Sequence, residues 1–196
     1  MVLAGLALAA STTWAARNIL VFGDSLSAGY GIPQDAAWPS LLAKRLEQNR
    51  LDYSVTNASI SGETTSGGRT RLAAALDKAQ PAVVVIALGA NDGLRGLPLP
   101  QMRANLDAMI AASRAAGARV LLAGMRLPPN YGPYADEFAG VFADLARRHQ
   151  VALLPFLLEP VAGRPRLFQA DNLHPVAEAQ PLILDHVWPA LAPLLK

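Results

Sequence analysis

Five short apolar runs recur along the chain, and each of them predicts a β-strand. They cover residues 18–23, 53–58, 82–88, 118–123 and 151–155. The third run, AVVVIAL, is continuously apolar and rich in β-branched residues. Such a run is typical of a central strand that is covered on both faces of its sheet.

The segments between these runs repeat their apolar residues every three or four positions, which predicts amphipathic helices. The clearest stripes begin at Trp38, Met102 and Phe138. Further helices are expected over residues 69–79 and from Pro175 onward, since proline suits the first turn of a helix. The alternation of strands and helices predicts an α/β fold with one parallel sheet, right-handed crossovers and helices on both sides. No linker or repeat interrupts the pattern, so we expect one domain over residues 17–196.

The first sixteen residues follow a different pattern. Residues 2–10 are an unbroken run of Val, Leu, Ala and Gly, and mostly small residues follow up to Ala16. The run is shorter than the roughly 20 residues that span a bilayer, and it fits the apolar region of a signal peptide. No Lys or Arg precedes it, which leaves an upstream start or an atypical signal open, and an anchoring or unstructured arm is the alternative. We expect residues 1–16 to be a signal peptide cleaved after Ala15 or Ala16, and the protein to be periplasmic or secreted.

Charge and composition narrow the classes of partner. The formal net charge is +2, and the basic residues are scattered in small groups without interleaved aromatic residues. This pattern does not support nucleic-acid binding. The chain has no cysteine, which excludes disulfides and thiolate catalysis. It also lacks the G-x-S-x-G, Walker A, G-x-G-x-x-G and H-E-x-x-H motifs. Their absence argues against a classical α/β-hydrolase and against a nucleotide-binding enzyme.

Residues with catalytic chemistry follow several of the predicted strands. Ser25 comes after the first strand, Gly62 after the second and Asn91 after the third, and Asp171 and His174 follow the fifth after a longer stretch. The carboxyl ends of parallel strands share one edge of the sheet, where ligands collect. We therefore expect a hydroxyl, a backbone amide, a side-chain amide and an Asp/His pair on one rim.

This set of residues fits ester hydrolysis by a serine nucleophile. A serine hydroxyl needs a base, and His174 is expected to serve Ser25 through Nε2. Asp171 is three residues before His174, so one turn brings its carboxylate to Nδ1, where it fixes the tautomer. The oxyanion formed by attack needs donors fixed in advance, and the amides of Ser25 and Gly62 with the Asn91 side chain are the candidates.

The Gly23-Asp24-Ser25 stretch has a simpler interpretation when it is taken alone. Asp and Ser are common in turns and at helix N-termini, so these three residues by themselves predict an ordinary turn or cap. The other rim residues change that interpretation for Ser25. For Asp24 we expect hydrogen bonds that hold the nucleophile loop rather than acid–base chemistry.

Four sequence blocks also carry a family resemblance. GDSLSAG, NASISGET, GANDGLRG and DNLHP stand in the order and spacing of the blocks of the SGNH-hydrolase (GDSL esterase/lipase) superfamily. AAWPSLL, RLPPNYG, LLPF and AQP are similar to its bacterial periplasmic thioesterase, lysophospholipase and arylesterase branch. The resemblance covers the mature chain and implies a three-layer α/β/α fold with a flavodoxin-like sheet of five parallel strands. It implies the same triad and oxyanion hole, with no metal and no cofactor.

The resemblance also suggests where the substrate binds. It implies a mobile loop over about residues 92–97 that closes on an acyl chain. The candidate substrate contacts are Asp24, Leu94, Leu97, Arg126 and Tyr131. The chain departs from the family pattern at three positions: Ala90 and Asn172 stand where glycine is usual, and Glu63 stands where aspartate is common.

We therefore expect a monomeric serine ester hydrolase whose partner is a small-molecule acyl ester or thioester. Aryl esters, acyl-CoA-like thioesters and lysophospholipids fit, and the protein would make transient contact with lipid but no stable insertion. One alternative is a carbohydrate O-acetylesterase on the same scaffold, which would need a wider polar cleft. The other is a non-catalytic flavodoxin-like ligand-binding module, which would keep its ligand when Ser25 is replaced by Ala.

Overall fold

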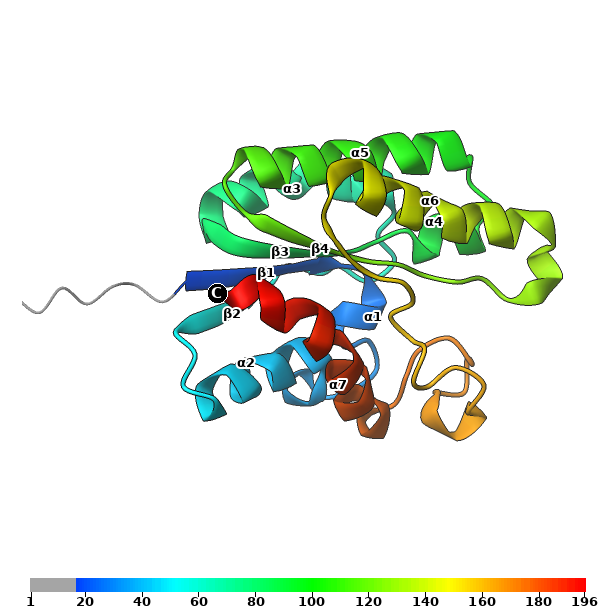
Figure 1. Cartoon of the computed structure of the whole chain (residues 1–196). Helices are drawn as coiled ribbons and strands as arrows, with labels where there is room; N and C mark the ends of the chain where they lie inside the picture. The colour runs from blue at the N-terminus through cyan, green and yellow to red at the C-terminus, as the bar shows by residue number, and fades with distance from the viewer. Residues whose placement is uncertain (1–16) are drawn as a thin grey trace, which may run out of the picture.

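The computed structural model describes residues 17–196, which form a parallel five-stranded sheet between two layers of helices (Figure 1). The strands are β1 (Arg17–Gly23), β2 (Tyr53–Asn57), β3 (Pro81–Ala87), β4 (Arg119–Ala123) and β5 (Ala152–Leu154). Their order is β2-β1-β3-β4-β5, and every neighbouring pair is parallel. The three-layer, flavodoxin-like α/β fold expected from the sequence is confirmed. The signal peptide expected over residues 1–16 lies outside the described residues.

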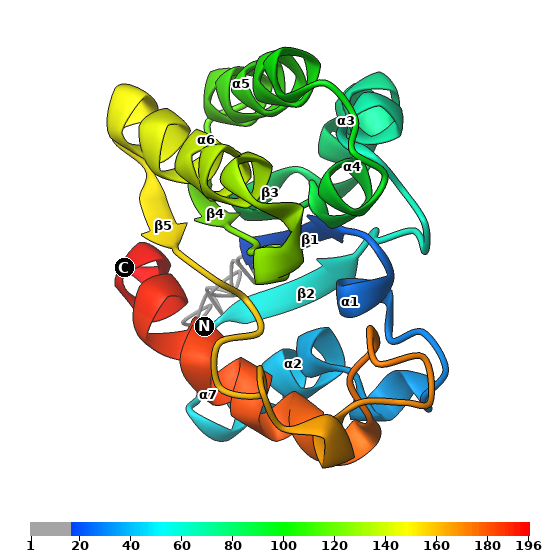
Figure 2. The same ribbon diagram turned by 90° about the vertical axis from the view of Figure 1, so that its right-hand side faces the viewer.

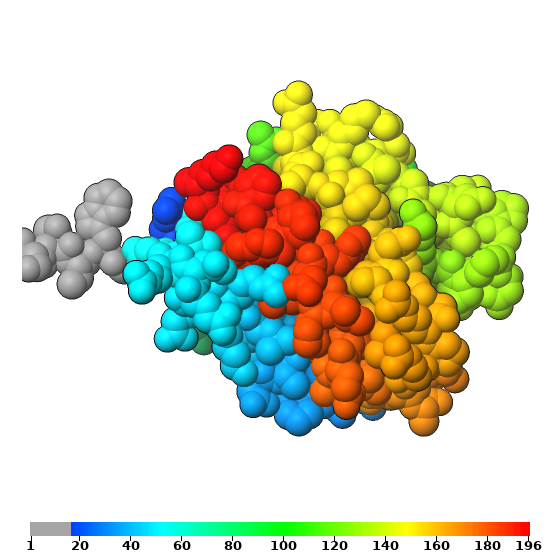
Figure 3. Space-filling model, turned by 60° about the horizontal axis from the view of Figure 1, so that its bottom comes forward, coloured from blue at the N-terminus to red at the C-terminus, as the bar shows by residue number. Residues whose placement is uncertain are grey.

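Helices cover both faces of the sheet. The helices are α1 (Ser25–Ala28), α2 (Trp38–Gln48), α3 (Thr65–Ala79), α4 (Ala90–Leu94), α5 (Leu99–Ala115), α6 (Pro133–His149) and α7 (Gln180–Leu191). Figures 1 and 2 show α3, α5 and α6 on one face and α2 with α7 on the other. On the surface in Figure 3, α2 and α7 lie side by side, and the segment after β5 runs beside α7. Among residues 17–196, no helix has the length and apolar composition needed to cross a bilayer.

The core lies around β1 and β3, the two strands with the longest mutual pairing. Residues 19–22 of β1 and 83–86 of β3 are at most 1% exposed. Because both faces of these strands are covered, each run is continuously apolar, as the sequence pattern indicated. The aromatic stripe of α6 also belongs to the core, where Phe138 and Phe142 meet edge to face with ring centroids 5.4 Å apart.

The strand order determines where a site can form. The chain passes from β1 outward to β2 and then returns across β1 to β3, so the winding direction reverses between β1 and β3. In open α/β sheets the crevice at the carboxyl ends of such strands is the usual ligand site. Ser25 follows β1 and Asn91 follows β3, and both are therefore at this crevice.

One expected helix start is wrong. Pro175 does not begin a helix but forms an isolated antiparallel bridge with Phe168. Val176 N–H donates to Leu167 O at 3.0 Å and Gln169 N–H donates to His174 O at 2.8 Å. This long-range pairing outweighs the local preference of proline for a helix start. A 3₁₀ turn follows over Ala177–Ala179, and α7 begins only at Gln180.

We predict opposite stability effects for two glycine substitutions within helices. A Cβ at Gly68 in α3 would lie 2.4 Å from Leu88 Cδ1, whereas a Cβ at Gly140 in α6 would meet nothing within 4 Å. Gly68→Ala should lower the free energy of unfolding by about 1–3 kcal/mol through overpacking. Gly140→Ala should raise it by about 0.5–1 kcal/mol through helix propensity. Urea unfolding followed by far-UV circular dichroism measures both, and equal effects would contradict the close packing of α3 on the sheet.

Candidate active site

Ser25 is the first residue of α1 and follows β1 almost without a connection. Asp24 is the N-cap, and its Oδ1 accepts a hydrogen bond from Leu26 N–H at 3.1 Å. A Cβ at Gly23 would lie 3.0 Å from Ala87 O and 2.9 Å from Ser27 Oγ. The tight bend therefore needs a residue without a side chain at Gly23. The bend holds the Ser25 hydroxyl at the carboxyl edge of the sheet.

Three side chains form a continuous chain of hydrogen bonds at this edge. Ser25 Oγ lies 2.8 Å from His174 Nε2, and His174 Nδ1 lies 2.7 Å from Asp171 Oδ2. The other Asp171 oxygen accepts hydrogen bonds from the backbone N–H groups of Leu173 at 2.9 Å and His174 at 3.0 Å. The hydrogen bonds from the His174 backbone and ring and from Leu173 lower the pKa of Asp171 to about 2. The carboxylate is therefore ionised at neutral pH and holds a proton on Nδ1, which leaves Nε2 free to accept one from Ser25.

The backbone of residues 171–175 explains one departure from the family pattern. Asn172 has φ of 57°, in the left-handed region that glycine adopts most easily. Asparagine is the next most tolerant residue there, so Asn172 can replace the usual glycine without moving the loop. The bridge between Phe168 and Pro175 then fixes the backbone on the C-terminal side of His174.

The loop that carries Gly62 extends the hydrogen bonding of β2 past the end of the strand. Ala58 N–H donates to Val21 O at 2.8 Å and Ile60 N–H donates to Gly23 O at 3.0 Å, which places the loop beside the nucleophile bend. Gly62 has φ of 80°, and its amide donates no hydrogen bond to any of the described residues. This amide is therefore available to a ligand.

Arg71 from α3 holds the same loop from behind. Its guanidinium donates to Ala58 O at 2.6 Å, forms an ion pair with Glu63 and lies 3.9 Å from the centroid of the Phe22 ring. A longer carboxylate at position 63 than the aspartate common in the family still finds this partner. The loop is thus fastened to both the sheet and α3.

Asn91 approaches from the first turn of α4. Its Nδ2 donates to Glu63 O at 3.0 Å and lies 3.4 Å from Asp24 Oδ2. The side-chain amide therefore sits between the Gly62 loop and the nucleophile bend. Ala90, just before it, lines the adjacent pocket, so its methyl group adds to an apolar wall.

Two buried carboxylates adjoin these groups. Asp24 is 1% exposed, and burial raises its pKa to about 7, although the Leu26 N–H bond and the His174 charge oppose the shift. Asp92 is 3% exposed and accepts hydrogen bonds from Thr65 N–H at 2.8 Å and Thr65 Oγ1 at 2.6 Å. Asp92 thereby joins α4 to the start of α3, next to Asn91.

The segment expected as a loop over residues 92–97 is partly helical. It is part of α4 through Leu94, and Leu97 N–H then closes a turn onto Asp92 O at 2.9 Å. The long-range contact between Asp92 and Thr65 favours the helical conformation here, and no local pattern in the sequence predicts that contact. The family resemblance instead implied a mobile loop over these residues.

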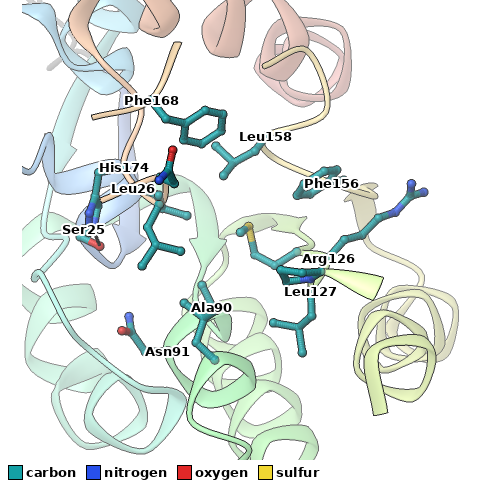
Figure 4. Close-up of a pocket in the computed structure, with 15 residues that line it drawn as sticks. Ser25, Leu26, Ala90, Asn91, Arg126, Leu127, Phe156, Leu158, Phe168 and His174 are labelled. Atoms are coloured by element: carbon teal, nitrogen blue, oxygen red, sulfur yellow. Dashed lines mark hydrogen bonds between the residues drawn. The ribbon is translucent and has the colours of Figure 1, made fainter. Parts of the chain in front are cut away.

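An apolar pocket of about 190 Å³ opens beside Ser25 (Figure 4). Ser25 and His174 lie at one end, and Arg126 and Phe156 lie at the other. The apolar side chains of its lining are Leu26, Ala90, Leu94, Met125, Leu127, Pro128, Phe156, Leu158, Phe168 and Leu173. The apolar lining suits a hydrocarbon group bound next to the Ser25 hydroxyl.

The five candidate substrate contacts lie in different places. Leu94 and Arg126 line the pocket, whereas Asp24, Leu97 and Tyr131 do not. Tyr131 donates from its hydroxyl to Leu94 O at 3.2 Å, and Leu97 O accepts from Tyr134 at 2.8 Å. Tyr131 thus stabilises the end of α4, and Leu97 belongs to the following turn, which Tyr134 stabilises.

Sequence reasoning missed part of the pocket wall. Phe156, Leu158 and Phe168 come from the long segment after β5. Their position after a strand's carboxyl end was the available signal, but the irregular pattern of this segment concealed which side chains face inward. The remaining two histidines make structural contacts: a ring nitrogen of His149 lies 2.8 Å from Asp107 Oδ1, and one of His186 lies 3.0 Å from Phe156 O.

Comparisons with known proteins agree with this geometry. A model of the GDSL-like Lipase/Acylhydrolase family matches residues 21–180. The chain is 50% identical over 182 residues to Esterase TesA of Pseudomonas aeruginosa, covering 92% of this chain and 90% of that protein. It is 43% identical over 183 residues to Thioesterase 1/protease 1/lysophospholipase L1 of Escherichia coli K12, covering 93% and 86%. A crystal structure of TesA superposes with a TM-score of 0.89 at 50% identity, covering 91% of this chain and 99% of that one. The chain belongs to the GDSL-like lipase/acylhydrolase family and is a carboxylic ester hydrolase.

Proposed function

We propose that this enzyme hydrolyses acyl esters and thioesters through an acyl-enzyme on Ser25, with His174 as base and Asp171 as its orienting carboxylate. The proposal rests on the unbroken line from Ser25 Oγ through both His174 nitrogens to Asp171. A serine hydroxyl is a weak nucleophile until such a base accepts its proton.

The reaction proceeds in two halves. Ser25 Oγ bonds to the acyl carbon while its proton passes to His174 Nε2, and the imidazolium is stabilised by the ionised Asp171. His174 then gives this proton to the leaving oxygen or sulfur as the bond to the acyl carbon breaks. A water molecule repeats the sequence on the acyl-enzyme, losing its proton to His174, and the carboxylic acid leaves as Ser25 regains its hydrogen.

The oxyanion of each tetrahedral intermediate would be held by three donors. The Ser25 amide begins a helix and so has no partner within it, and the Gly62 amide makes no bond to the described residues. Asn91 Nδ2 adds the third, because its contact with Asp24 at 3.4 Å is long enough to be exchanged for a charged oxygen. Donors fixed before the reaction need no reorganisation when the charge appears.

The pocket favours acyl chains over acetylated sugars. A carbohydrate O-acetylesterase would need a wide polar cleft, whereas the space beside Ser25 is lined mainly by Leu, Phe, Met and Pro side chains. Medium-chain or longer acyl groups of esters, thioesters and lysophospholipids suit it. A non-catalytic ligand-binding module has no need for the hydrogen-bonded line of Ser25, His174 and Asp171.

Asp24 would act as a positioning residue for the nucleophile. Its carboxylate caps α1 at Leu26 N–H, and its second oxygen faces Asn91 Nδ2. One buried side chain thus contacts the nucleophile helix and an oxyanion donor together. It is outside the pocket lining and would not touch the acyl chain.

The proposed setting is the periplasm or the exterior. Residues 1–16 have the composition of a signal peptide, which supports export. Transient contact with lipid suits an exposed pocket mouth that includes Leu94 and Leu173.

Ser25→Ala should abolish both ester hydrolysis and covalent labelling by an organophosphonate probe. The phosphonate reacts only with an activated serine, so labelling identifies the nucleophile directly. The measurement is mass spectrometry of the intact protein after incubation, together with p-nitrophenyl ester turnover. A folded wild-type protein that neither reacts with the probe nor hydrolyses the ester would refute the proposed function.

Asn91→Ala should lower kcat about 100-fold to 1,000-fold with a smaller change in KM, because the lost donor acts mainly in the transition state. Steady-state kinetics on one p-nitrophenyl ester provide the test. Asn18→Ala is the matched control, since this partly buried asparagine donates to Thr56 Oγ1 and Ala79 O near the start of β1, at the opposite end of the strand from Ser25. An Asn91→Ala enzyme with wild-type kcat would remove Asn91 from the oxyanion hole.

Asp24→Asn should flatten the pH dependence of stability between about pH 4 and 7. The folded-state pKa of Asp24 is raised from 3.8 to about 7, so its protonated form stabilises the folded state below about pH 4. That contribution is lost as the pH rises through 7, when the buried carboxyl must ionise. Asparagine keeps the helix cap but does not titrate. Urea unfolding across this pH range would give parallel curves for the two proteins if burial did not raise the pKa.

A further inference from the structure

Tyr30 is an exposed aromatic residue placed against the catalytic histidine. Its side chain belongs to a residue that is 52% exposed, and its ring centroid lies 4.5 Å from that of His174 with the planes tilted by 41°. Tyr30 is absent from the lining of the acyl pocket, whereas His174 and the neighbouring Leu173 belong to it. The tyrosine ring therefore meets the imidazole outside the pocket that would receive the acyl chain.

The contact between Tyr30 and His174 is fixed by the backbone on both sides. Gln169 Nε2 donates to Tyr30 O at 2.8 Å and to Pro175 O at 3.2 Å, and Gln169 N–H donates to His174 O at 2.8 Å. One glutamine thus ties together two segments that are far apart in the sequence. A Cβ at Gly31 would lie 2.2 Å from Gln169 Oε1, so the glycine after Tyr30 makes room for this clamp.

The nucleophile side is tied to Tyr30 as well. Tyr30 N–H donates to Ser25 O at 3.2 Å, just beyond the left-handed Gly29 that ends α1. The Tyr30 backbone is therefore held close to both the Ser25 backbone and the His174 loop, and its ring contacts the His174 ring.

The chemistry of an ester divides the surroundings of Ser25 into two halves. The acyl group extends into the apolar pocket, and the leaving group must point away from it. The leaving atom also has to come within hydrogen-bond distance of His174 Nε2, which gives it a proton. A group in that position lies beside the imidazole and outside the acyl pocket, and Tyr30 is a side chain that contacts the imidazole without lining that pocket.

We propose that the part of the Tyr30 ring left exposed beside His174 is the leaving-group subsite and that it favours aryl and other flat apolar alcohols. This inference rests on the proposed function. An aromatic leaving group stacks on the tyrosine ring while it stays next to His174, and aromatic pairs of this kind change an equilibrium about twofold to tenfold. A small alkyl alcohol has no such contact.

The test compares two esters of butyric acid that share the acyl group and differ in the alcohol, 2-naphthyl butyrate and ethyl butyrate. For each ester kcat/KM reports acylation, in which the alcohol is still present. Deacylation is the same step for both esters because the alcohol has already left, and single-turnover kinetics measure it separately. Each variant is compared with wild type on the same ester, which removes the intrinsic reactivity of the alcohols.

Tyr30→Ala should lower kcat/KM for the naphthyl ester about threefold to tenfold more than for the ethyl ester, and should leave the deacylation rate unchanged. Tyr30→Phe should keep the preference, since the ring and not the hydroxyl makes the contact. Leu173→Ala is the matched control: this residue is also exposed and adjoins His174, but it lines the acyl pocket. It should affect both esters alike.

Other outcomes overturn the inference in recognisable ways. If Tyr30→Ala slows both esters and deacylation by the same factor, Tyr30 only positions His174, and the subsite is refuted. If neither ester changes, the ring has no role in the reaction and the subsite is again refuted. A wild-type protein that hydrolyses neither ester would refute the proposed function itself, which is a distinct result.

Discussion

The close approach of backbones where β1 ends is the constraint on which the site depends. Gly23 leaves no room for a Cβ beside Ala87 O, so the chain can turn at once from the central strand into α1. Because β1 is buried on both faces, packing restrains the position of its end. Ser25 follows that end directly, so its position is restrained as well. The loops after β2 and β3 start at the same edge of the sheet. Gly62 and Asn91 on these loops therefore lie close to Ser25.

Each of these loops is held by a contact that reaches outside its own segment. Arg71 holds the Gly62 loop. Asp92 holds the turn of Asn91 against Thr65. Gln169 holds the His174 loop to Tyr30. Backbone carbonyls and amides make many of these bonds, so they fix main-chain position rather than side-chain identity. Catalysis by positioned donors depends on this kind of prior order, since a group held within a few tenths of an ångström needs no rearrangement during the reaction.

The local signals in the sequence were sufficient for the strands, for the layers and for the juxtaposition of Ser25, His174 and Asp171. Periodicity and composition are properties of neighbouring residues, and the strand ends then place the polar residues on one rim. The errors arose where distant contacts decide the conformation. Pro175 pairs with Phe168 instead of starting a helix, and residues 92–94 are helical next to Thr65. The inward-facing side chains after β5 were not predicted because the apolar residues of that segment recur with neither helical nor strand periodicity.

The two sides of Ser25 differ in how they can change. The acyl pocket is built from side chains of several elements that also belong to the core, such as Leu26, Met125 and Leu158, so altering its shape disturbs packing. On the other side, Tyr30 is half exposed and held by its backbone, so its side chain can change with little effect on the fold. Under the proposed function, specificity for the acyl group is therefore coupled to stability, whereas specificity at the proposed Tyr30 subsite is not. The same sheet and the same triad can in this way serve different esters through substitutions confined to one exposed position.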